Sequence, residues 1–210
     1  SEKAMAEAAR RNASDVAMAN QEACVCSRFT FIEATPEQAD RYCELLANEI
    51  RIDRMGEGEP RPLESDLREQ IEVLRMMDDD YAVFGASDGR GVAIRSEEPV
   101  DFHPLRKTSN VVCVSSLEDA VKYVNVATQT VGVWPFHRMK DLRDRLAFRA
   151  GTQRRVQVGD SGLDPFRRGL VGRERQSKRI SADRVTTHPH QELELGLRHP
   201  ITHRDLALAE

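Results

Sequence analysis

Two cysteines that lie close together in the sequence are the residues best suited to nucleophilic chemistry. Cys24 and Cys26 occur within residues 20–33, directly before an alternating, strand-like run. A thiol on a loop between a helix and a strand is held by rigid elements, near backbone N–H groups that favour its thiolate. Free cysteine is also among the most buried residue types, and then acts as a small apolar side chain. The stretch alone leaves both interpretations of Cys24 open.

The cysteines, the adjacent aspartates and the histidines of this sequence do not have the spacing of a metal site. The four cysteines include one close pair and lack the second pair of a zinc site. Three adjacent carboxylates at residues 78–80 are typical of a solvated acidic turn. The histidines near the end of the chain are not spaced as a helical His-x-x-x-His pair; they are His188, His190, His199 and His203. We therefore predict no bound metal, and we expect the thiols to be reduced.

Composition and charge narrow the class of protein. The chain has 210 residues, is 40% hydrophobic and has a net charge of −4, from 31 Lys and Arg against 35 Asp and Glu. This is enough apolar material for a core, without a basic field that would attract nucleic acid or an anionic membrane. No apolar run approaches the roughly 20 residues of a membrane span, and residues 1–4 do not begin a signal peptide. We expect a soluble, cytoplasmic protein.

Two elements would position Cys24. Residues 2–19 predict a helix that breaks at residues 12–15, where small polar side chains compete with the helical hydrogen bonds. After the cysteines, residues 29–32 alternate as a short strand with Phe29 and Phe31 on one face.

A second helix has a strong start signal. Thr35 is an N-cap, Pro36 occupies the first helical position, and Gln38 completes a capping box. The predicted helix covers residues 36–53, and its apolar residues recur at helical spacing, which places Cys43 in the core.

The rest of the chain alternates between helix and strand signals. The predicted elements are a helix at 63–77, a hairpin of 81–85 and 91–95, a strand at 110–114, a helix at 116–125, a strand at 128–134, a helix at 137–150 and a strand at 154–158. Gly89 and Gly91 lie in the hairpin turn, whereas a dinucleotide fingerprint needs a further glycine that opens a helix. This order predicts an α/β domain over residues 1–158 with a parallel or mixed sheet. Residues 159–210 show no sustained period and are treated as an irregular tail.

Several sequence blocks along residues 10–160 carry a family resemblance. They are residues 15–17, residues 20–24 with Ser27, residues 100–106, residues 116–125 and residues 129–133. In this order they resemble the catalytic half of bacterial acyl-CoA reductases of the kind that supplies aldehyde to luciferase. That family belongs to the aldehyde dehydrogenase superfamily.

The resemblance implies a fold and a reaction. The fold would be an aldehyde-dehydrogenase-like α/β catalytic domain with helices flanking the sheet, incomplete relative to the family. Cys24 takes the place of the nucleophile that accepts the acyl group of acyl-CoA, and a reduced nicotinamide cofactor then converts the acyl-cysteine into an aldehyde. The backbone N–H of Cys24 would stabilise the oxyanion that forms when the thiolate attacks the thioester carbonyl. Asn20 and Gln21 would shape the nucleophile loop, and Cys26 matches a small, Ser-like position.

The resemblance also implies parts that would precede Ser1. In the family, the nucleotide-binding half, the general base and the Asn of the oxyanion hole lie upstream of the nucleophile. We therefore expect NADPH (or NADH) to be supplied by a domain not present in this chain or by a second chain, and homo-oligomerisation stays open. The cofactor contacts predicted within this sequence are Asp101, a shifted counterpart of an acidic residue in ordinary aldehyde dehydrogenases, and its neighbour Phe102.

Two alternatives agree with the same blocks. The chain is either a catalytically inactive fragment or assembly partner of a larger reductase, or a fragment of an aldehyde dehydrogenase that acts on free aldehydes. Acylation of Cys24 by acyl-CoA would distinguish the reductase from both.

Overall fold

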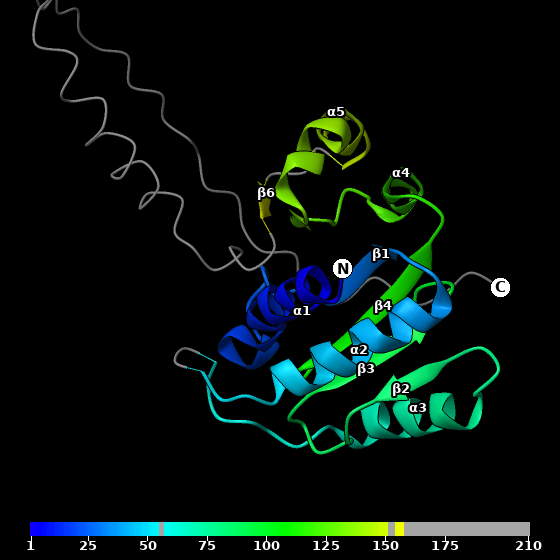
Figure 1. The fold of residues 1–210 in the computed structure, drawn as a ribbon. Helices are drawn as coiled ribbons and strands as arrows, with labels where there is room; N and C mark the ends of the chain where they lie inside the picture. The colour runs from blue at the N-terminus through cyan, green and yellow to red at the C-terminus, as the bar shows by residue number, and fades with distance from the viewer. Residues whose placement is uncertain (55–56, 151–153, 158–210) are drawn as a thin grey trace, which may run out of the picture. The chain divides into compact units, whose positions relative to one another are not determined.

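A mixed four-stranded sheet lies at the centre of the fold (Figure 1). The structure, a computed structural model, describes residues 1–54, 57–150 and 154–157. The sheet has the order β1-β4-β3-β2, and its strands are β1 (Phe29–Glu33), β2 (Ala82–Phe84), β3 (Val92–Ser96) and β4 (Thr108–Val114). Strands β1 and β3 pair with β4 in parallel, and β2 pairs with β3 antiparallel. The predicted α/β class and the predicted hairpin are confirmed.

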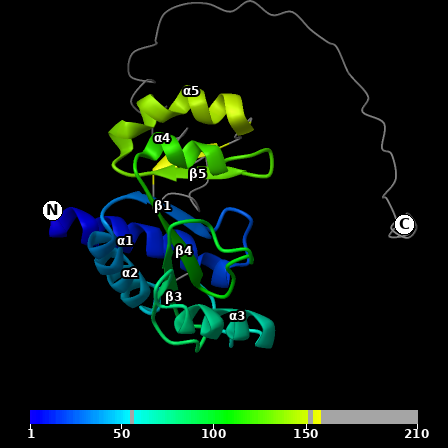
Figure 2. The same cartoon turned by 90° about the vertical axis from the view of Figure 1, so that its right-hand side faces the viewer.

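Helices cover both faces of this sheet (Figures 1 and 2). They are α1 (Glu2–Ala17) and α2 (Pro36–Ile50) on one face, and α3 (Ser65–Met76) on the other. Because successive side chains of a strand point to opposite faces, Ala93 contacts the α1–α2 core while Val92 and Ile94 contact α3. Strand β4 is covered on both sides, as its continuous apolar run predicts.

A smaller parallel sheet joins β5 (Thr130–Val133) to β6 (Arg154–Gln157). The helical segments beside it are α4 (Leu117–Ala120), the 3₁₀ turns η2 (Val121–Tyr123) and η3 (Phe136–Arg138), and α5 (Met139–Ala150). Apolar side chains of η2, β5 and α5 form a separate core there. The predicted strands are therefore divided between two sheets, and the helix predicted at 116–125 is shorter and ends in a 3₁₀ turn.

The predicted start of α2 is confirmed in detail. Gln38 N–H donates to Thr35 Oγ1 at 3.4 Å, and Thr35 N–H donates to Gln38 Oε1 at 3.1 Å. The helix ends at Ile50 and not at residue 53. The guanidinium of Arg54 donates to the carbonyl oxygen of Glu49 at 2.7 Å, which satisfies a terminal acceptor of the helix without further turns.

The predicted break in the first helix at residues 12–15 is wrong, since α1 continues to Ala17. Asn12 does not compete with the helical backbone. Its amide donates to Thr30 Oγ1 at 2.9 Å and to Tyr42 Oη at 3.0 Å. These long-range partners satisfy the polar side chain inside the core, so the helix is not interrupted.

Other predictions fall at the edges of the described structure. Met77, predicted to lie on the apolar face of the third helix, follows α3 and is 43% exposed. The predicted tail at 159–210 and its histidines lie outside the described residues.

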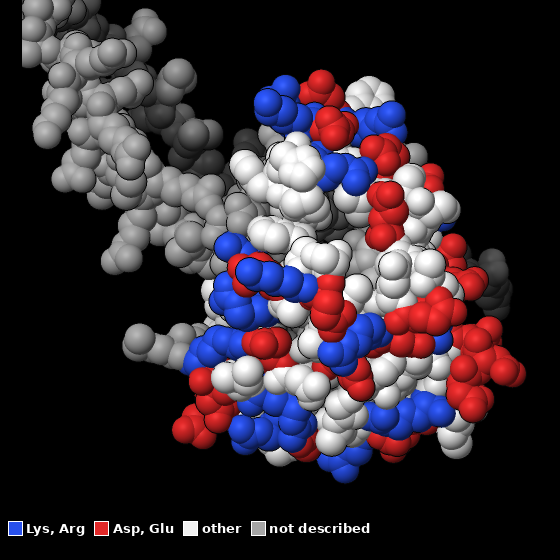
Figure 3. Space-filling model, viewed as in Figure 1, with Lys and Arg blue, Asp and Glu red and all other residues white. Residues whose placement is uncertain are grey.

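Among the helices that are described, none combines the length and the apolar character that crossing a membrane requires. On the face drawn in Figure 3, positive and negative side chains are interspersed.

Candidate functional site

Cys24 lies on the turn that connects α1 to β1, here called the Cys24 turn (residues 18–27). Directly after α1, the residues Ala19, Asn20 and Gln21 have φ angles of 48°, 53° and 62°. A left-handed conformation costs a residue with a Cβ about 1–2 kcal/mol. Since no glycine relieves this cost, contacts from other segments must stabilise the turn.

The side chain of Gln21 supplies several of these contacts. It is fully buried, and its Nε2 donates to the carbonyl oxygens of Ser27 at 2.8 Å and Thr108 at 2.7 Å. Its Oε1 accepts the N–H of Thr108 at 3.1 Å. The amide therefore joins both ends of the Cys24 turn to the start of β4.

A buried ion pair lies beside Asn20. The Asn20 N–H donates to the carbonyl oxygen of Glu57 at 2.5 Å, and the Glu57 carboxylate lies 3.2 Å from the ammonium of Lys107. The side chains of Lys107 and Glu57 are only 1% and 6% exposed. The Asn20 side chain is buried too, and its amide has no hydrogen-bond partner in the described part of the chain.

The structure separates the two neighbouring thiols by their surroundings. Cys24 is exposed, whereas Cys26 is buried and its Sγ–H donates to the carbonyl oxygen of Met18 at 3.1 Å. Burial raises the pKa of the Cys26 thiol, and a backbone hydrogen bond at Ala23 and the charge of Arg28 offset this only in part. Cys26 is thus held as a protonated donor within the turn, and Cys24 is the thiol that a reagent can reach.

Burial also accounts for the remaining two cysteines. It raises the pKa of Cys43, which is fully buried on the inner face of α2, and that of Cys113 on β4, which is partly buried. The core position predicted for Cys43 is confirmed.

A cavity of about 880 Å³ is lined by Cys24 and by strands β1 and β5. Much of its wall is aromatic or aliphatic, and the side chains that give it this character include Phe29, Phe31, Tyr123, Val131 and Trp134. The rings of Phe31 and Tyr123 stack with their centroids 5.0 Å apart. A large, mainly apolar cavity beside an accessible thiol can hold an apolar ligand in reach of a nucleophile.

Arg28 and His103 line the same cavity. Arg28 Nη1 donates to the carbonyl oxygen of Pro104 at 3.0 Å. Partial burial lowers the pKa of Arg28, opposed by electrostatic interactions with Cys26 and Cys24. Partial burial and then the charge of Arg28 lower the pKa of His103, so its imidazole is neutral at pH 7.

The loop that carries His103 is fixed to the sheet by Asn110. Its Oδ1 accepts the N–H of Val100 at 3.0 Å, and its Nδ2 donates to Ile94 O at 3.0 Å and Ser96 Oγ at 2.8 Å. All of these bonds are inside the core, so the position of the loop is well determined.

The two residues predicted to contact a cofactor lie in that loop. Asp101 is exposed, and Phe102 packs against the core between the sheet and α3. Gly89 belongs to the β2–β3 connection, where an added Cβ would lie 1.9 Å from the Arg61 carbonyl oxygen. In the described segments we find no glycine-rich turn that would bind the phosphates of a dinucleotide. The cofactor contacts of Asp101 and Phe102 therefore stay predictions, and we derive no step from them.

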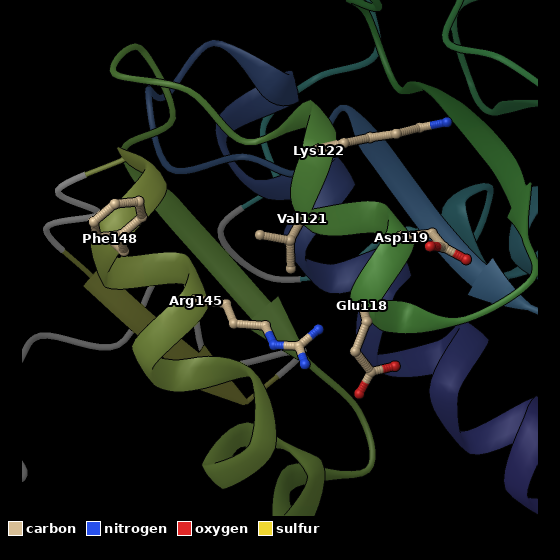
Figure 4. A pocket seen from close by; sticks show the side chains of 6 residues that line it. All are labelled: Glu118, Asp119, Val121, Lys122, Arg145 and Phe148. Atoms are coloured by element: carbon tan, nitrogen blue, oxygen red, sulfur yellow. The ribbon is translucent and has the colours of Figure 1, made fainter.

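A second cavity of about 300 Å³ lies between α4 and α5 (Figure 4). Its lining consists of Glu118, Asp119, Val121, Lys122, Arg145 and Phe148. It contains no thiol, and we assign no chemistry to it. Among the described residues there is also no group of three or more side chains suited to hold a metal ion.

Three residues of the site were not predicted as such. Arg28 could have been noticed in the sequence, because it is a charged residue that lies directly before the strand and four positions after Cys24. His103 lies within residues 100–106, which the sequence marks only through the family resemblance. The burial of Glu57 was not predicted, because its buried partner Lys107 is 50 positions away, although Arg54 also lies 3.4 Å from its carboxylate.

Comparison with known proteins identifies a family. A family model described as acyl-CoA reductase (LuxC) matches residues 1–169. A search of curated proteins finds no match. The matched range covers the Cys24 turn, the cavity and the loop that carries His103.

Proposed function

Because the chain belongs to the acyl-CoA reductase (LuxC) family, we propose that Cys24 accepts the acyl group of a fatty acyl-CoA before its reduction to an aldehyde. The observation that carries the proposal is an exposed thiol in the wall of a large, mainly apolar cavity. The cavity suits the alkyl part of an acyl chain, and the thiol suits exchange with a thioester.

The acyl-transfer step begins when the Cys24 thiol loses its proton to water. The Cys24 thiolate attacks the thioester carbonyl, and the oxyanion is stabilised by the Cys24 N–H; one well-placed donor contributes about 3–4 kcal/mol. The hydrogen bonds of the Asn20 N–H and of the Gln21 side chain hold the turn in its left-handed conformation and fix the backbone around Cys24. The coenzyme A thiolate then leaves, and the acyl group stays on Cys24.

The later reduction calls for a reductant, and the family implies a nicotinamide cofactor. We propose NADPH or NADH, held by a domain outside this chain or by a second chain. We assign acyl transfer to residues 1–158 and no role to residues 159–210. Four reduced cysteines fit a cytoplasmic setting.

The test is acylation of the purified chain by a long-chain acyl-CoA, followed by intact mass measurement. We expect one acyl adduct that hydroxylamine removes, that is absent in Cys24→Ala, and that is retained in the matched variants Cys26→Ser and Cys113→Ser. An adduct that survives in Cys24→Ala would assign the chemistry to another thiol.

The same assay separates the alternative functions. A chain that takes no acyl group from acyl-CoA but reacts at Cys24 with small alkylating reagents would refute the proposal. It would favour an inactive assembly partner or a fragment that acts on free aldehydes.

A further inference from the structure

Arg28 stands out among the charged residues of the described structure, because it lines the Cys24 cavity without a carboxylate partner. Many other arginines form ion pairs, as Arg106 and Arg61 do with Glu22. The polar contact of the Arg28 guanidinium is the single hydrogen bond to Pro104 O at 3.0 Å. No carboxylate of the described residues pairs with it.

A partly buried, unpaired cation is costly, because it loses hydration without gaining a counter-charge. Such a group is common where a protein binds or generates an anion. The guanidinium has five N–H donors, and the bond to Pro104 uses one of them. The remaining donors are available to an anion within the cavity.

We propose that Arg28 is the group that stabilises the negative charge formed at Cys24 during acyl transfer. Both residues line the same cavity, and Arg28 follows Cys24 by four positions, directly before β1. The bond to Pro104 fixes the guanidinium beside this wall. The proposal rests on the proposed function, which supplies acyl-CoA as the substrate. The electrostatic effect of the Arg28 guanidinium at Cys24 can nevertheless be measured without acyl-CoA.

Negative charge arises at each stage of the step. The Cys24 thiolate carries it first, and it moves to the carbonyl oxygen when the new C–S bond forms. It then leaves with the electron pair on the coenzyme A sulfur, when the second C–S bond breaks and that thiolate is protonated by water. A fixed guanidinium lowers the energy of all three charged species, and of the tetrahedral one most if it donates a hydrogen bond to that oxygen.

The other ionisable groups of the cavity do not replace Arg28. His103 is neutral at pH 7, because partial burial and Arg28 itself lower its pKa. The electrostatic effect of Asp15 raises the pKa of the Cys26 thiol, so Asp15 cannot supply positive charge to the cavity. Arg28 is thus the one fixed positive charge among the described residues that line this cavity.

The test compares two alkylating reagents that differ in charge. Iodoacetate is anionic and iodoacetamide is neutral, and both react with the same Cys24 thiolate. The ratio of their rate constants therefore reports the local field and is independent of the thiolate fraction and of exposure. Measurement in a Cys26→Ser background, with mass mapping of the Cys24 peptide, isolates the relevant thiol.

We expect Arg28→Gln to lower the iodoacetate-to-iodoacetamide ratio about three- to tenfold, the effect of one nearby charge. Arg28→Lys, which keeps the charge, should stay within about twofold of the parent. Arg61→Gln is the matched control, because it removes an exposed arginine that is paired with Glu22 near the turn, and its ratio should not change. Circular dichroism and cooperative urea unfolding confirm that each variant is folded.

A ratio in folded Arg28→Gln within twofold of the parent, or an equal fall in Arg28→Lys, would overturn the role of Arg28. If the parent takes no acyl group from acyl-CoA but the ratio falls as expected, the proposed function fails and the electrostatic role of Arg28 stands. If acylation occurs but the ratio is unchanged in Arg28→Gln, the proposed function stands and the electrostatic role of Arg28 fails.

Discussion

Removal of one charge from the buried Glu57–Lys107 pair should destabilise the protein strongly. Glu57→Gln leaves an ammonium with 1% exposure of its side chain without a counter-charge. At the observed separation of 3.2 Å and an effective dielectric constant of about 20, the Coulomb attraction is about 5 kcal/mol. Because the amide oxygen of the introduced glutamine can still accept a hydrogen bond from Lys107, we expect a net loss nearer 3 kcal/mol, the lower end of the range of about 3–5 kcal/mol for a broken buried pair.

The double variant provides the sharper test. In Glu57→Gln/Lys107→Met both charges of the pair are removed, so their desolvation cost disappears together with their attraction. Arg54, which also lies 3.4 Å from Glu57, keeps Glu49 as its counter-charge. We expect its unfolding free energy to lie within about 1.5 kcal/mol of the parent, far from the sum of the two single losses. The matched control is Glu64→Gln, whose carboxylate pairs with Arg106 but is 69% exposed; its loss should stay below about 0.5 kcal/mol.

The assay is urea unfolding followed by circular dichroism. The midpoint should fall without a change in the dependence on urea, because the surface exposed on unfolding is the same. In a thermal scan, a loss of 3 kcal/mol corresponds to about 6–12 °C for a protein of this size. A loss under 1 kcal/mol for Glu57→Gln, or additive losses in the double variant, would show that the pair does not stabilise the fold as described.

Two further predictions concern the backbone. Gln21→Leu should cost about 2–4 kcal/mol in urea unfolding, since backbone groups of Ser27 and Thr108 lose their partner inside the core, and it should also change the alkylation rate of Cys24; an unaltered midpoint would contradict the contacts described. Gly85→Ala should cost more than about 2 kcal/mol, because φ is +87° and the added Cβ would lie 2.2 Å from Gly91 O. The control is Gly58→Ala, because Gly58 has φ of +78° but the nearest atom to its added Cβ would be 3.8 Å away. Its free energy of unfolding should fall by only about 1 kcal/mol, the cost of the left-handed conformation. Equal losses in the two variants would refute the predicted clash with Gly91 O.

Local signals predicted the elements whose causes are local. The capping box at Thr35 and Gln38 is complete within four residues, and it starts α2 where expected. The continuous apolar run of β4 follows from burial of both of its faces. The alternation of β1 predicted a strand correctly, but Phe29 and Ile32 of β1 pack on opposite faces of the sheet. The error at residues 12–15 has a long-range cause, because Asn12 is satisfied by Thr30 and Tyr42, which lie far away in the sequence.

The conformation of the Cys24 turn shows why the sequence can indicate a candidate nucleophile but not the geometry of its backbone. Nothing in the side chains of Ala19 or Gln21 favours a left-handed backbone, so local propensity would place this segment elsewhere. The cost is offset by contacts with Glu57 and Thr108, both distant in the sequence. Because those contacts come from the loop before α3 and from the start of β4, Cys24 reaches its position only after both segments have folded. Acylation of Cys24 by acyl-CoA, which needs the folded cavity, should therefore be lost at the same urea concentration as the global fold. Loss of acylation at a lower urea concentration would show that the turn is only a local loop.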